Sequence, residues 1–288
     1  FSLLSAGVPG TVAGLHQALT KHGTMTWKEV LEPSIRLAEE GFAVPHDLAN
    51  ILASSRYKKR LSSNEAAAKS YYKSDKSNYQ AGEILKLPDL AWTLKQLSNN
   101  GPDAFYKGEI AKKIVKEMER NGGLINADDL QNYMPIERSP VEGTYKNFKI
   151  VSMPPASSGG IHLIQMLNMI EEFPIKDMGF GSADSLHILA EVMKRAYADR
   201  SKHLGDMDFY DVPFALISKE YSSFLNKSIS VNSRTASKDV FAGDPYPYES
   251  PDTTHFSVMD QYGNAVSNTY TLNFSYGSGI MIPGTGML

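Results

Sequence analysis

The stretch that decides the fold runs from residue 253 to residue 273 and reads TTHFSVMDQYGNAVSNTYTLN. Residues 253–260 alternate in side-chain character, and residues 265–273 alternate again. The four residues between them include Gly263, and a tight turn favours glycine because glycine tolerates positive φ. Thr and Val are good strand formers. The pattern therefore predicts an antiparallel hairpin, which is the strongest β signal in the chain.

A long polar stretch leads directly into this hairpin. Residues 227–250 are rich in Ser, Asn, Asp and Pro, and a loop of that length in a compact protein is either functional or unstructured. A self-cleaving precursor would be arranged in this way. Cleavage after Asp252 would give Thr253 a free α-amino group with a pKa near ~8, which can take the proton from its own Oγ. Thr253 is therefore a candidate nucleophile, and the alternative is an ordinary β-forming threonine.

A capping box marks the clearest helix upstream. Thr26 is followed three residues later by Glu29, an arrangement in which each side chain hydrogen-bonds the backbone N–H of the other residue. The box predicts a helix over residues 27–40 that ends at Gly41.

The remaining elements are predicted from apolar spacing and from Gly and Pro positions. Helices are expected within residues 9–58, over 87–101 and 102–122, after Asn126, and over 161–171 and 182–204. Residues 140–153 predict a second hairpin, and the polar residues 61–82 predict a surface connection with a short strand.

Composition excludes several classes of function. The 288 residues are 42% hydrophobic, which is enough for one large domain or two of ordinary size. Lys plus Arg total 29 against 32 Asp plus Glu, so the net charge of −3 gives no reason to expect a nucleic-acid or anionic-membrane partner. The absence of cysteine excludes disulfides, thiolate metal sites and a cysteine nucleophile. The chain has no run of ~18 apolar residues, so no membrane-spanning helix is predicted.

Other short motifs are given structural interpretations. Residues 277–279 read Gly-Ser-Gly without a following helix, so they are not a dinucleotide loop. Residues 157–160 read Ser-Ser-Gly-Gly and are interpreted as a helix N-cap rather than an anion site. His187 and Glu191 are interpreted as a surface pair, because no third metal ligand is evident. The basic residues 56–60 are interpreted as a solvated helix end. We expect no metal and no cofactor.

Residues 253–277 as a whole resemble the signature of the γ-glutamyltranspeptidases. The resemblance extends over the two strands, the turn between them and the Tyr-Gly pair at 276–277. Four further stretches resemble the same family, namely GVPG at 7–10, NGPDAFY at 100–106, MPPASSGG at 153–160 and YADR at 197–200. The resemblance therefore covers essentially the whole chain.

The resemblance implies a fold and a maturation step. The fold is α+β, the αββα sandwich of N-terminal-nucleophile hydrolases, with a large helical portion and incomplete in this chain. The precursor would cleave itself between Asp252 and Thr253. Residues 1–252 would then belong to the large-subunit region, and residues 253–288 would begin the small-subunit region, within one structural domain.

The resemblance also implies the site residues. Thr271 corresponds to a second threonine that hydrogen-bonds the nucleophile Thr253. Asn273 corresponds to an asparagine that holds the α-amino group of a γ-glutamyl substrate. Antiparallel strands joined by a tight turn bring their far ends together, so these positions are compatible with one site. The implied reaction is γ-glutamyl transfer and hydrolysis from glutathione and other γ-glutamyl amides through a Thr253 acyl-enzyme.

Several family residues have no counterpart between residues 1 and 288. These are the substrate arginine, the paired serines and paired glycines of the oxyanion and carboxylate site, and an aspartate that grips the α-amino group. Residues 157–160 do not replace them, because they belong to a large-subunit loop. We therefore expect the chain as given to be a fragment that stays uncleaved and has little or no activity by itself.

Two alternatives stay open. The first is a glutaryl or cephalosporin-type acylase of the same superfamily, against which Asn273 argues. The second is a non-catalytic relative that keeps the fold, against which the intact Thr253 and Thr271 argue. The expected partners are small γ-glutamyl donors, amino-acid or peptide acceptors and the remaining part of the small subunit. The resemblance implies a periplasmic or secreted location.

Overall fold

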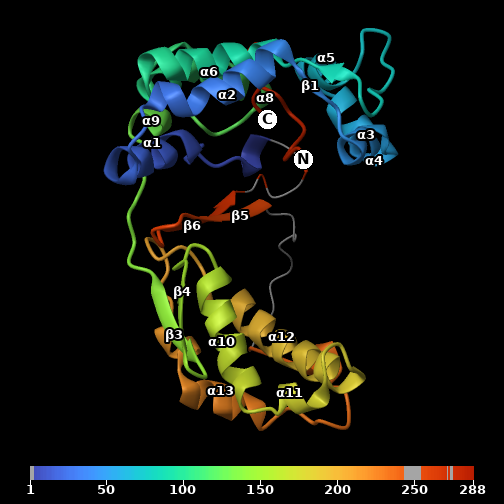
Figure 1. Ribbon diagram of the computed structural model, residues 1–288, viewed down its shortest axis with the longest axis vertical. Coiled ribbons are helices and arrows are strands. Elements are labelled where there is room, and N and C mark those ends of the chain that lie inside the picture. Colours follow the sequence, from blue (N-terminus) through green and yellow to red (C-terminus); the bar gives the residue numbers. More distant parts are fainter. Residues whose placement is uncertain (1–2, 243–253, 271, 273–274) are drawn as a thin grey trace. The chain divides into compact units, whose positions relative to one another are not determined.

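The computed structural model describes residues 3–242, 254–270, 272 and 275–288 (Figure 1). Contacts within the chain divide it into two compact units. Unit 1 comprises Phe1–Ile136 with Ser250–Leu288, and unit 2 comprises Glu137–Glu249. This division does not test the prediction of one structural domain, which stays a prediction.

Unit 1 is mainly helical, with two small antiparallel strand pairs among its described residues. Its helices are η1 Leu3–Ser5, α1 Thr11–His22, α2 Trp27–Glu40, α3 His46–Ala53, α4 Ser55–Ser62, α5 Glu65–Tyr71, α6 Pro88–Asn100, α7 Asp103–Tyr106, α8 Glu109–Asn121 and α9 Ala127–Gln131. Its strand pairs are β1 Phe42–Ala43 with β2 Ile84–Leu85, and β5 Thr254–Met259 with β6 Ala265–Tyr270.

The capping box forms at the start of α2, as predicted. Thr26 Oγ1 accepts a hydrogen bond from the Glu29 backbone N–H at 3.2 Å, and Glu29 Oε2 accepts one from the Thr26 N–H at 2.7 Å. The helix ends at Gly41, whose φ of +94° suits glycine. Helix α2 lies beside α6 (Figure 1), and Trp27 Nε1 donates to the Leu97 carbonyl at 3.0 Å. The predicted helices over 27–40 and 87–101 are confirmed.

The predicted continuous helix over residues 102–122 is wrong in one respect. The structure has two helices, α7 and α8, that are interrupted at Lys107–Gly108. A Cβ on Gly108 would lie 2.7 Å from the Ala104 carbonyl oxygen, so the glycine permits a close backbone approach at the break. After the break, Ile110, Ile114 and Met118 share one buried face of α8 in the core of unit 1.

The prediction of a surface connection over residues 61–82 holds for residues 73–82 but is wrong for the residues before them. Helix α5 occupies Glu65–Tyr71, and the Asn64 side chain caps it by accepting from the Ala67 backbone N–H at 2.9 Å. Ala67 is completely buried, and the buried Tyr72 donates its hydroxyl to the Leu52 carbonyl at 3.1 Å. An N-cap followed by three alanines favours a helix even without a long apolar stripe.

Unit 2 consists of one hairpin and a group of helices. Its elements are β3 Val141–Tyr145, β4 Phe148–Ser152, α10 Gly159–Glu171, α11 Ile175–Met178, α12 Ala183–His203, η2 Phe214–Ile217, α13 Lys219–Asn226 and η3 Ser237–Asp239. Helix α10 packs against β3, α12 and α13 (Figure 1). Gly143 of β3 permits this contact, because a Cβ there would lie 2.5 Å from Ile164 Cγ2. The predicted hairpin and the two longer helices are confirmed.

A buried ion-pair network holds the loop that follows α13. Glu191 has no exposed surface, and its carboxylate pairs with Arg195 Nη1 at 2.8 Å and with Lys194 Nζ at 2.6 Å. It also accepts from the Thr235 backbone N–H at 2.9 Å, while Arg195 Nη2 donates to the Ser228 carbonyl at 2.6 Å. The interpretation of Glu191 as half of a surface pair is therefore wrong.

The hydrogen bonds to Glu191 outweigh its desolvation. Burial alone would raise the pKa of this carboxyl, but the hydrogen bonds from Lys194, Arg195 and Thr235 hold the pKa at about 2. The side chain is therefore ionised at neutral pH and balances the buried Arg195 guanidinium.

We predict that Glu191→Gln loosens residues 228–235. The amide leaves the buried Arg195 without a counter-charge, a change that typically costs about 3–5 kcal/mol. Limited proteolysis should cut the substituted protein at least about tenfold faster within residues 227–242 than wild type. Glu220→Gln, at an exposed position of α13, is the control and should behave as wild type. Equal cleavage rates for Glu191→Gln and wild type would contradict the assigned role.

Candidate active site

Strands β5 and β6 form the predicted hairpin. The ladder begins with Thr254 opposite Tyr270, and the turn contains Gly263 at a φ of +85°. Asp260 closes the turn by accepting from the side-chain amide of Asn264 at 2.8 Å and from its backbone N–H at 2.9 Å. These hydrogen bonds lower the pKa of Asp260 and fix it as a turn-forming carboxylate.

The predicted site residues lie outside the residues that the structure describes; they are Asp252, Thr253, Thr271 and Asn273. The structure does describe their chain neighbours. Thr254 directly follows the predicted nucleophile and is paired with Tyr270 across the ladder. Leu272 lies between the other two site residues in the sequence. The roles of the four residues stay predictions, while the hairpin is confirmed over Thr254–Met259 and Ala265–Tyr270.

The segment after the hairpin is held by α4 and α5. Arg60 Nη1 donates to the Gly277 carbonyl at 2.9 Å and lies 3.5 Å from the Ser275 carbonyl. The Tyr276 ring meets the Tyr71 ring edge-on at a centroid distance of 5.2 Å and the Tyr57 ring at 6.0 Å. Burial among these rings raises the pKa of Tyr276, so its hydroxyl stays protonated at neutral pH.

Further along, the same segment is buried in unit 1. Met281 has no exposed surface, and its Sδ accepts from the Ser70 hydroxyl at 3.2 Å. Thr285 is also completely buried, and its carbonyl accepts from Thr93 Oγ1 of α6 at 2.7 Å. A Cβ on Gly286 would lie 2.5 Å from the Leu90 backbone nitrogen, so the chain passes directly against α6. The residues that follow the hairpin are therefore part of the core of unit 1.

The upstream stretches that resemble the family meet in pairs. In unit 1, Tyr106 of the stretch at 100–106 donates its hydroxyl to the Pro9 carbonyl of the stretch at 7–10, at 2.7 Å. In unit 2, Arg200 Nε donates to Ser158 Oγ at 2.8 Å, which joins the stretch at 197–200 to that at 153–160. The stretches that resemble the family therefore make packing contacts inside each unit.

A buried histidine lies beside the contact in unit 2. His162 of α10 is 7% exposed, and its ring meets the Tyr197 ring edge-on at 4.4 Å. Its Nε2 atom is buried and has no hydrogen-bond partner among the described residues. Burial and the nearby Arg200 lower the pKa of His162 to about 4. The neighbouring buried Asp199 accepts from Gln165 and from the Tyr221 hydroxyl, and burial raises its pKa.

The discounted motifs have structural roles in the described residues. Ser158 is the N-cap residue of α10, although its side chain bonds Arg200 rather than the helix backbone. His187 Nε2 lies 2.8 Å from the Ser230 carbonyl, so this ring helps to hold the loop after α13. Within the described ranges, no group of three His, Asp or Glu side chains is placed to bind a metal ion. No helix there has the length and apolar character to cross a membrane.

Sequence reasoning missed Arg60. The interpretation of residues 56–60 as a solvated helix end is wrong for this side chain, which binds carbonyls 215 and 217 residues away. It is also wrong for Lys58, whose Nζ donates to Asn78 Oδ1 at 2.9 Å. A sequence signal for such long-range contacts is weak, because a basic helix end looks the same whether it is solvated or bound.

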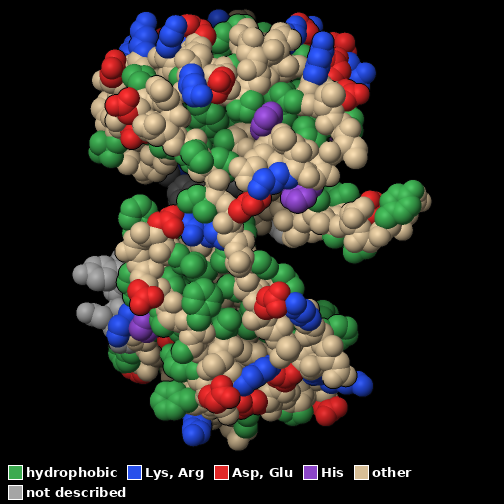
Figure 2. All heavy atoms as spheres, turned by 90° about the vertical axis from the view of Figure 1, so that its left-hand side faces the viewer, with side chains coloured by type: hydrophobic (Ala, Val, Ile, Leu, Met, Phe, Trp, Pro, Cys, Tyr) green, Lys and Arg blue, Asp and Glu red, His purple; other side chains and the backbone are tan. Residues whose placement is uncertain are grey.

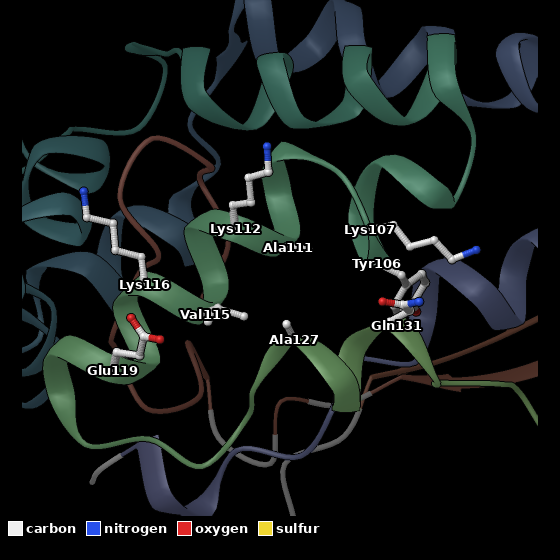
Figure 3. A pocket seen from close by; sticks show the side chains of 9 residues that line it. All are labelled: Tyr106, Lys107, Ala111, Lys112, Val115, Lys116, Glu119, Ala127 and Gln131. Atoms are coloured by element: carbon white, nitrogen blue, oxygen red, sulfur yellow. The ribbon is translucent and has the colours of Figure 1, made fainter.

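A surface depression of about 300 Å³ lies over α8 and α9 in unit 1 (Figure 3). Three lysines line it, together with Glu119 and small or uncharged residues. Figure 3 shows Lys112 and Lys116 extending away from Ala127 rather than converging on one point. Because these two amines do not converge, we assign no active site to the depression.

Comparison with known proteins identifies the family. The sequence profile described as Gamma-glutamyltranspeptidase matches residues 1–288. The chain belongs to the γ-glutamyltranspeptidase family. It is 45% identical over 288 residues to the glutathione hydrolase proenzyme of Escherichia coli K12, covering all of this chain and 49% of that protein. It is also 39% identical over 285 residues to the acylase ACY 1 proenzyme of Pseudomonas sp. SE83, covering 99% of this chain and 50% of that one.

Solved structures agree with this assignment. The γ-glutamyltranspeptidase of Helicobacter pylori superposes with a TM-score of 0.80 at 40% identity, covering 84% of this chain and 69% of that one. The predicted family and the α+β class of the N-terminal-nucleophile hydrolases are confirmed. The chain spans about half the length of the curated relatives it matches.

We predict that His162 makes unit 2 less stable in mild acid. The unfolded chain takes up a proton below a pKa of about 6.5, whereas the folded state takes it up only near pH 4. Stability therefore falls as the pH drops from 6.5 to 4, at about 1.4 kcal/mol per pH unit. Hydrogen exchange of the α10 and α12 amides at pH 7.5 and pH 5 measures this difference.

His162→Phe keeps an aromatic ring against Tyr197. The loss of stability between pH 7.5 and pH 5 should be about 2 kcal/mol smaller in this substituted protein than in wild type. His22→Phe, at an exposed position of α1, should keep the wild-type difference. The assignment is wrong if both substituted proteins retain the full pH dependence.

Proposed function

We propose that the protein catalyses γ-glutamyl transfer and hydrolysis, with Thr253 as the nucleophile. The carrying observation is the family match over residues 1–288, which includes the nucleophile hairpin. The donors would be glutathione, which the name of the Escherichia coli relative gives, and other γ-glutamyl amides. Water or the amine of an amino acid or peptide would accept the γ-glutamyl group.

Maturation would come first. Thr253 Oγ attacks the carbonyl carbon of Asp252, so that a C–O bond forms while the peptide C–N bond breaks. The proton of the hydroxyl passes to the departing nitrogen. Water then hydrolyses the ester, which leaves a carboxylate on Asp252 and a free α-amino group on Thr253. The large-subunit region would be residues 1–252, and the second chain would begin at residue 253.

Turnover would repeat the same attack on a substrate. The free α-amino group of Thr253 takes the proton from its own Oγ, which attacks the γ-carbonyl of the donor. The amine leaves with that proton, and an ester remains on the enzyme. Water or an acceptor amine then attacks the ester and releases the hydroxyl. Thr271 would hydrogen-bond the nucleophile, and Asn273 would hold the substrate α-amino group.

The described contacts support this scheme. Thr254 and Tyr270 are partners in the ladder, so the predicted Thr253 and Thr271 are chain neighbours of one pair. After cleavage, the second chain would still be bound to the first, because Met281 and Thr285 are buried in unit 1. A mature enzyme of two chains therefore needs no covalent bond between residues 252 and 253.

A further polypeptide region would complete the enzyme. Hydrophobic side chains lie on the surface of unit 2 (Figure 2), and on α12 they recur at helical spacing as Leu186, Leu189, Met193 and Tyr197. Such an exposed apolar stripe is typical of a face that packs against another element. We propose that the remaining part of the small subunit packs against this stripe. From the resemblance to the family we also propose a periplasmic or secreted location.

An acylase is the second candidate. The 39% identity to acylase ACY 1 favours it, and such an enzyme would use the same nucleophile on a glutaryl-type amide. Asn273 favours the γ-glutamyl donor, because a glutaryl group has no α-amino group to hold. Comparing hydrolysis of γ-glutamyl and glutaryl anilides by the full gene product separates the two. Faster glutaryl hydrolysis would favour the acylase.

We predict that Thr253→Ala blocks both maturation and turnover in the full gene product. Removing a nucleophile typically lowers kcat by at least ~10³-fold, so γ-glutamyl anilide hydrolysis should be lost. Mass spectrometry should show an intact chain and no species that begins at residue 253. Val266→Thr is the control, since this exposed strand position keeps a β-branched side chain.

Survival of both cleavage and hydrolysis in Thr253→Ala would refute the proposal. Full cleavage without hydrolysis in the wild type would instead indicate the non-catalytic relative or a different substrate. The Val266→Thr control should be cleaved and should turn over at the wild-type rate.

A further inference from the structure

The guanidinium of Arg60 binds the turn that follows the nucleophile hairpin. Arg60 is half-buried on α4, and its Nη1 reaches the carbonyls of Gly277 at 2.9 Å and Ser275 at 3.5 Å. Its guanidinium carbon lies 5.9 Å from the centre of the Tyr57 ring. The planar guanidinium presents several fixed N–H donors, and lysine does not reproduce that geometry.

The turn itself has an uncommon backbone. Tyr276 has a φ of +64° although it is not glycine, and Gly277 follows with a φ of +52°. A bulky residue in this region is an outlier that persists only where surrounding contacts impose it. Those contacts are the edge-on ring of Tyr71 and the hydrogen bonds from Arg60. The turn is therefore held from α4 and α5.

Arg60 also fits closely against the next glycine. Gly279 is buried with a φ of +76°, and a Cβ there would lie 2.4 Å from Arg60 Cγ and 2.8 Å from Cδ. Real Cβ atoms essentially never come so close, so any larger residue at 279 would displace the Arg60 side chain. Gly279→Ala would therefore move Arg60 without removing its charge, and it would also strain the backbone at this positive φ.

The turn connects Arg60 to the predicted site residues. A Cβ on Gly277 would lie 3.4 Å from Leu272 Cβ and 3.5 Å from the Leu272 carbonyl oxygen, so the two backbones approach closely. Leu272 is bonded to Thr271 on one side and to Asn273 on the other. Arg60 therefore binds Gly277, and Gly277 lies beside Leu272, the residue between the two predicted site positions.

We infer that Arg60 is a positioning residue for γ-glutamyl chemistry. It touches no reacting atom. It fixes the turn at 275–277, which lies beside Leu272, the chain neighbour of Thr271 and Asn273. The inference rests on the proposed function for the roles of those two residues. The anchors at Met281 and Thr285 lie further along the chain, so they hold the segment without setting this turn.

The test uses the full gene product with Arg60→Ala, Arg60→Lys and Gly279→Ala. Mass spectrometry counts the chains that begin at residue 253, and kcat and KM for a γ-glutamyl anilide are expressed per mature site. A small misplacement of reacting groups can cost up to ~10²-fold, so kcat/KM should fall about tenfold or more in Arg60→Ala. Arg60→Lys should retain an intermediate value, and Gly279→Ala should lower kcat/KM with the charge intact.

Arg56→Ala is the matched control. Arg56 lies on the same helix and contacts the same Tyr57 ring, with its guanidinium carbon 5.8 Å from the ring centre, but it is exposed. Its kcat/KM should stay within about twofold of wild type. A merely structural defect would lower the yield of folded protein and the melting temperature, and it would leave kcat/KM per site unchanged.

Two results would overturn the inference separately from the proposed function. If kcat/KM per mature site stays within twofold of wild type in both Arg60→Ala and Gly279→Ala, Arg60 does not position the site. If the wild type hydrolyses no γ-glutamyl anilide, the proposed function fails. The rate of cleavage after residue 252 then tests Arg60 alone, and an unchanged rate in Arg60→Ala overturns the positioning role.

Discussion

The burial of residues 275–288 against helices from the first third of the chain is the constraint on which the candidate site depends. Met281 and Thr285 have no exposed surface, and the carbonyl of Thr285 is bonded to a helix almost two hundred residues earlier in the sequence. A buried carbonyl needs a hydrogen-bond donor, so the position of this segment is specified by polar contacts as well as by packing. The hairpin that precedes it is consequently attached to a rigid element at its C-terminal end.

The four upstream stretches that resemble the family make contacts with one another inside the two units. Tyr106 joins the stretch at 100–106 to that at 7–10, and Arg200 joins the stretch at 197–200 to that at 153–160. These contacts lie inside one unit or the other, and none of the four stretches contains a predicted site residue. The described contacts of these stretches are packing contacts, while the predicted chemistry is assigned to Thr253, Thr271 and Asn273.

Local signals in the sequence were sufficient wherever neighbouring residues decide the structure. The Thr26–Glu29 box, the turn at Gly263 and the hairpin at 140–153 were all predicted, because each depends on residues within a few positions of one another. The misses have a different cause. Helix α5 carries too short an apolar pattern to show periodicity, and it is stabilised by its Asn64 cap and by the burial of Ala67.

Distant partners explain the other misses. Glu191 and Arg60 were both assigned to the surface because charged side chains usually lie there. Each instead binds a segment far away in the sequence, Glu191 the Thr235 backbone and Arg60 the Gly277 carbonyl. Such pairings depend on tertiary contacts that a single sequence does not reveal. The roles of Thr253, Thr271 and Asn273 stay predictions that rest on the resemblance, because these residues lie outside the described part of the chain.

The attachment of the hairpin at one end is compatible with a chain that cuts itself at the other. Before cleavage, the predicted nucleophile is tied by a peptide bond to Asp252 and, through the ladder and the turn at Tyr276, to α4 and α5. The proposed cleavage would remove the first tie and leave the second. A loop that had to hold the nucleophile from both sides would lose its geometry when cut. Here the hydrogen bonds from Arg60 and the burial of Met281 do not depend on the peptide bond that breaks, so the same contacts can serve both precursor and mature enzyme.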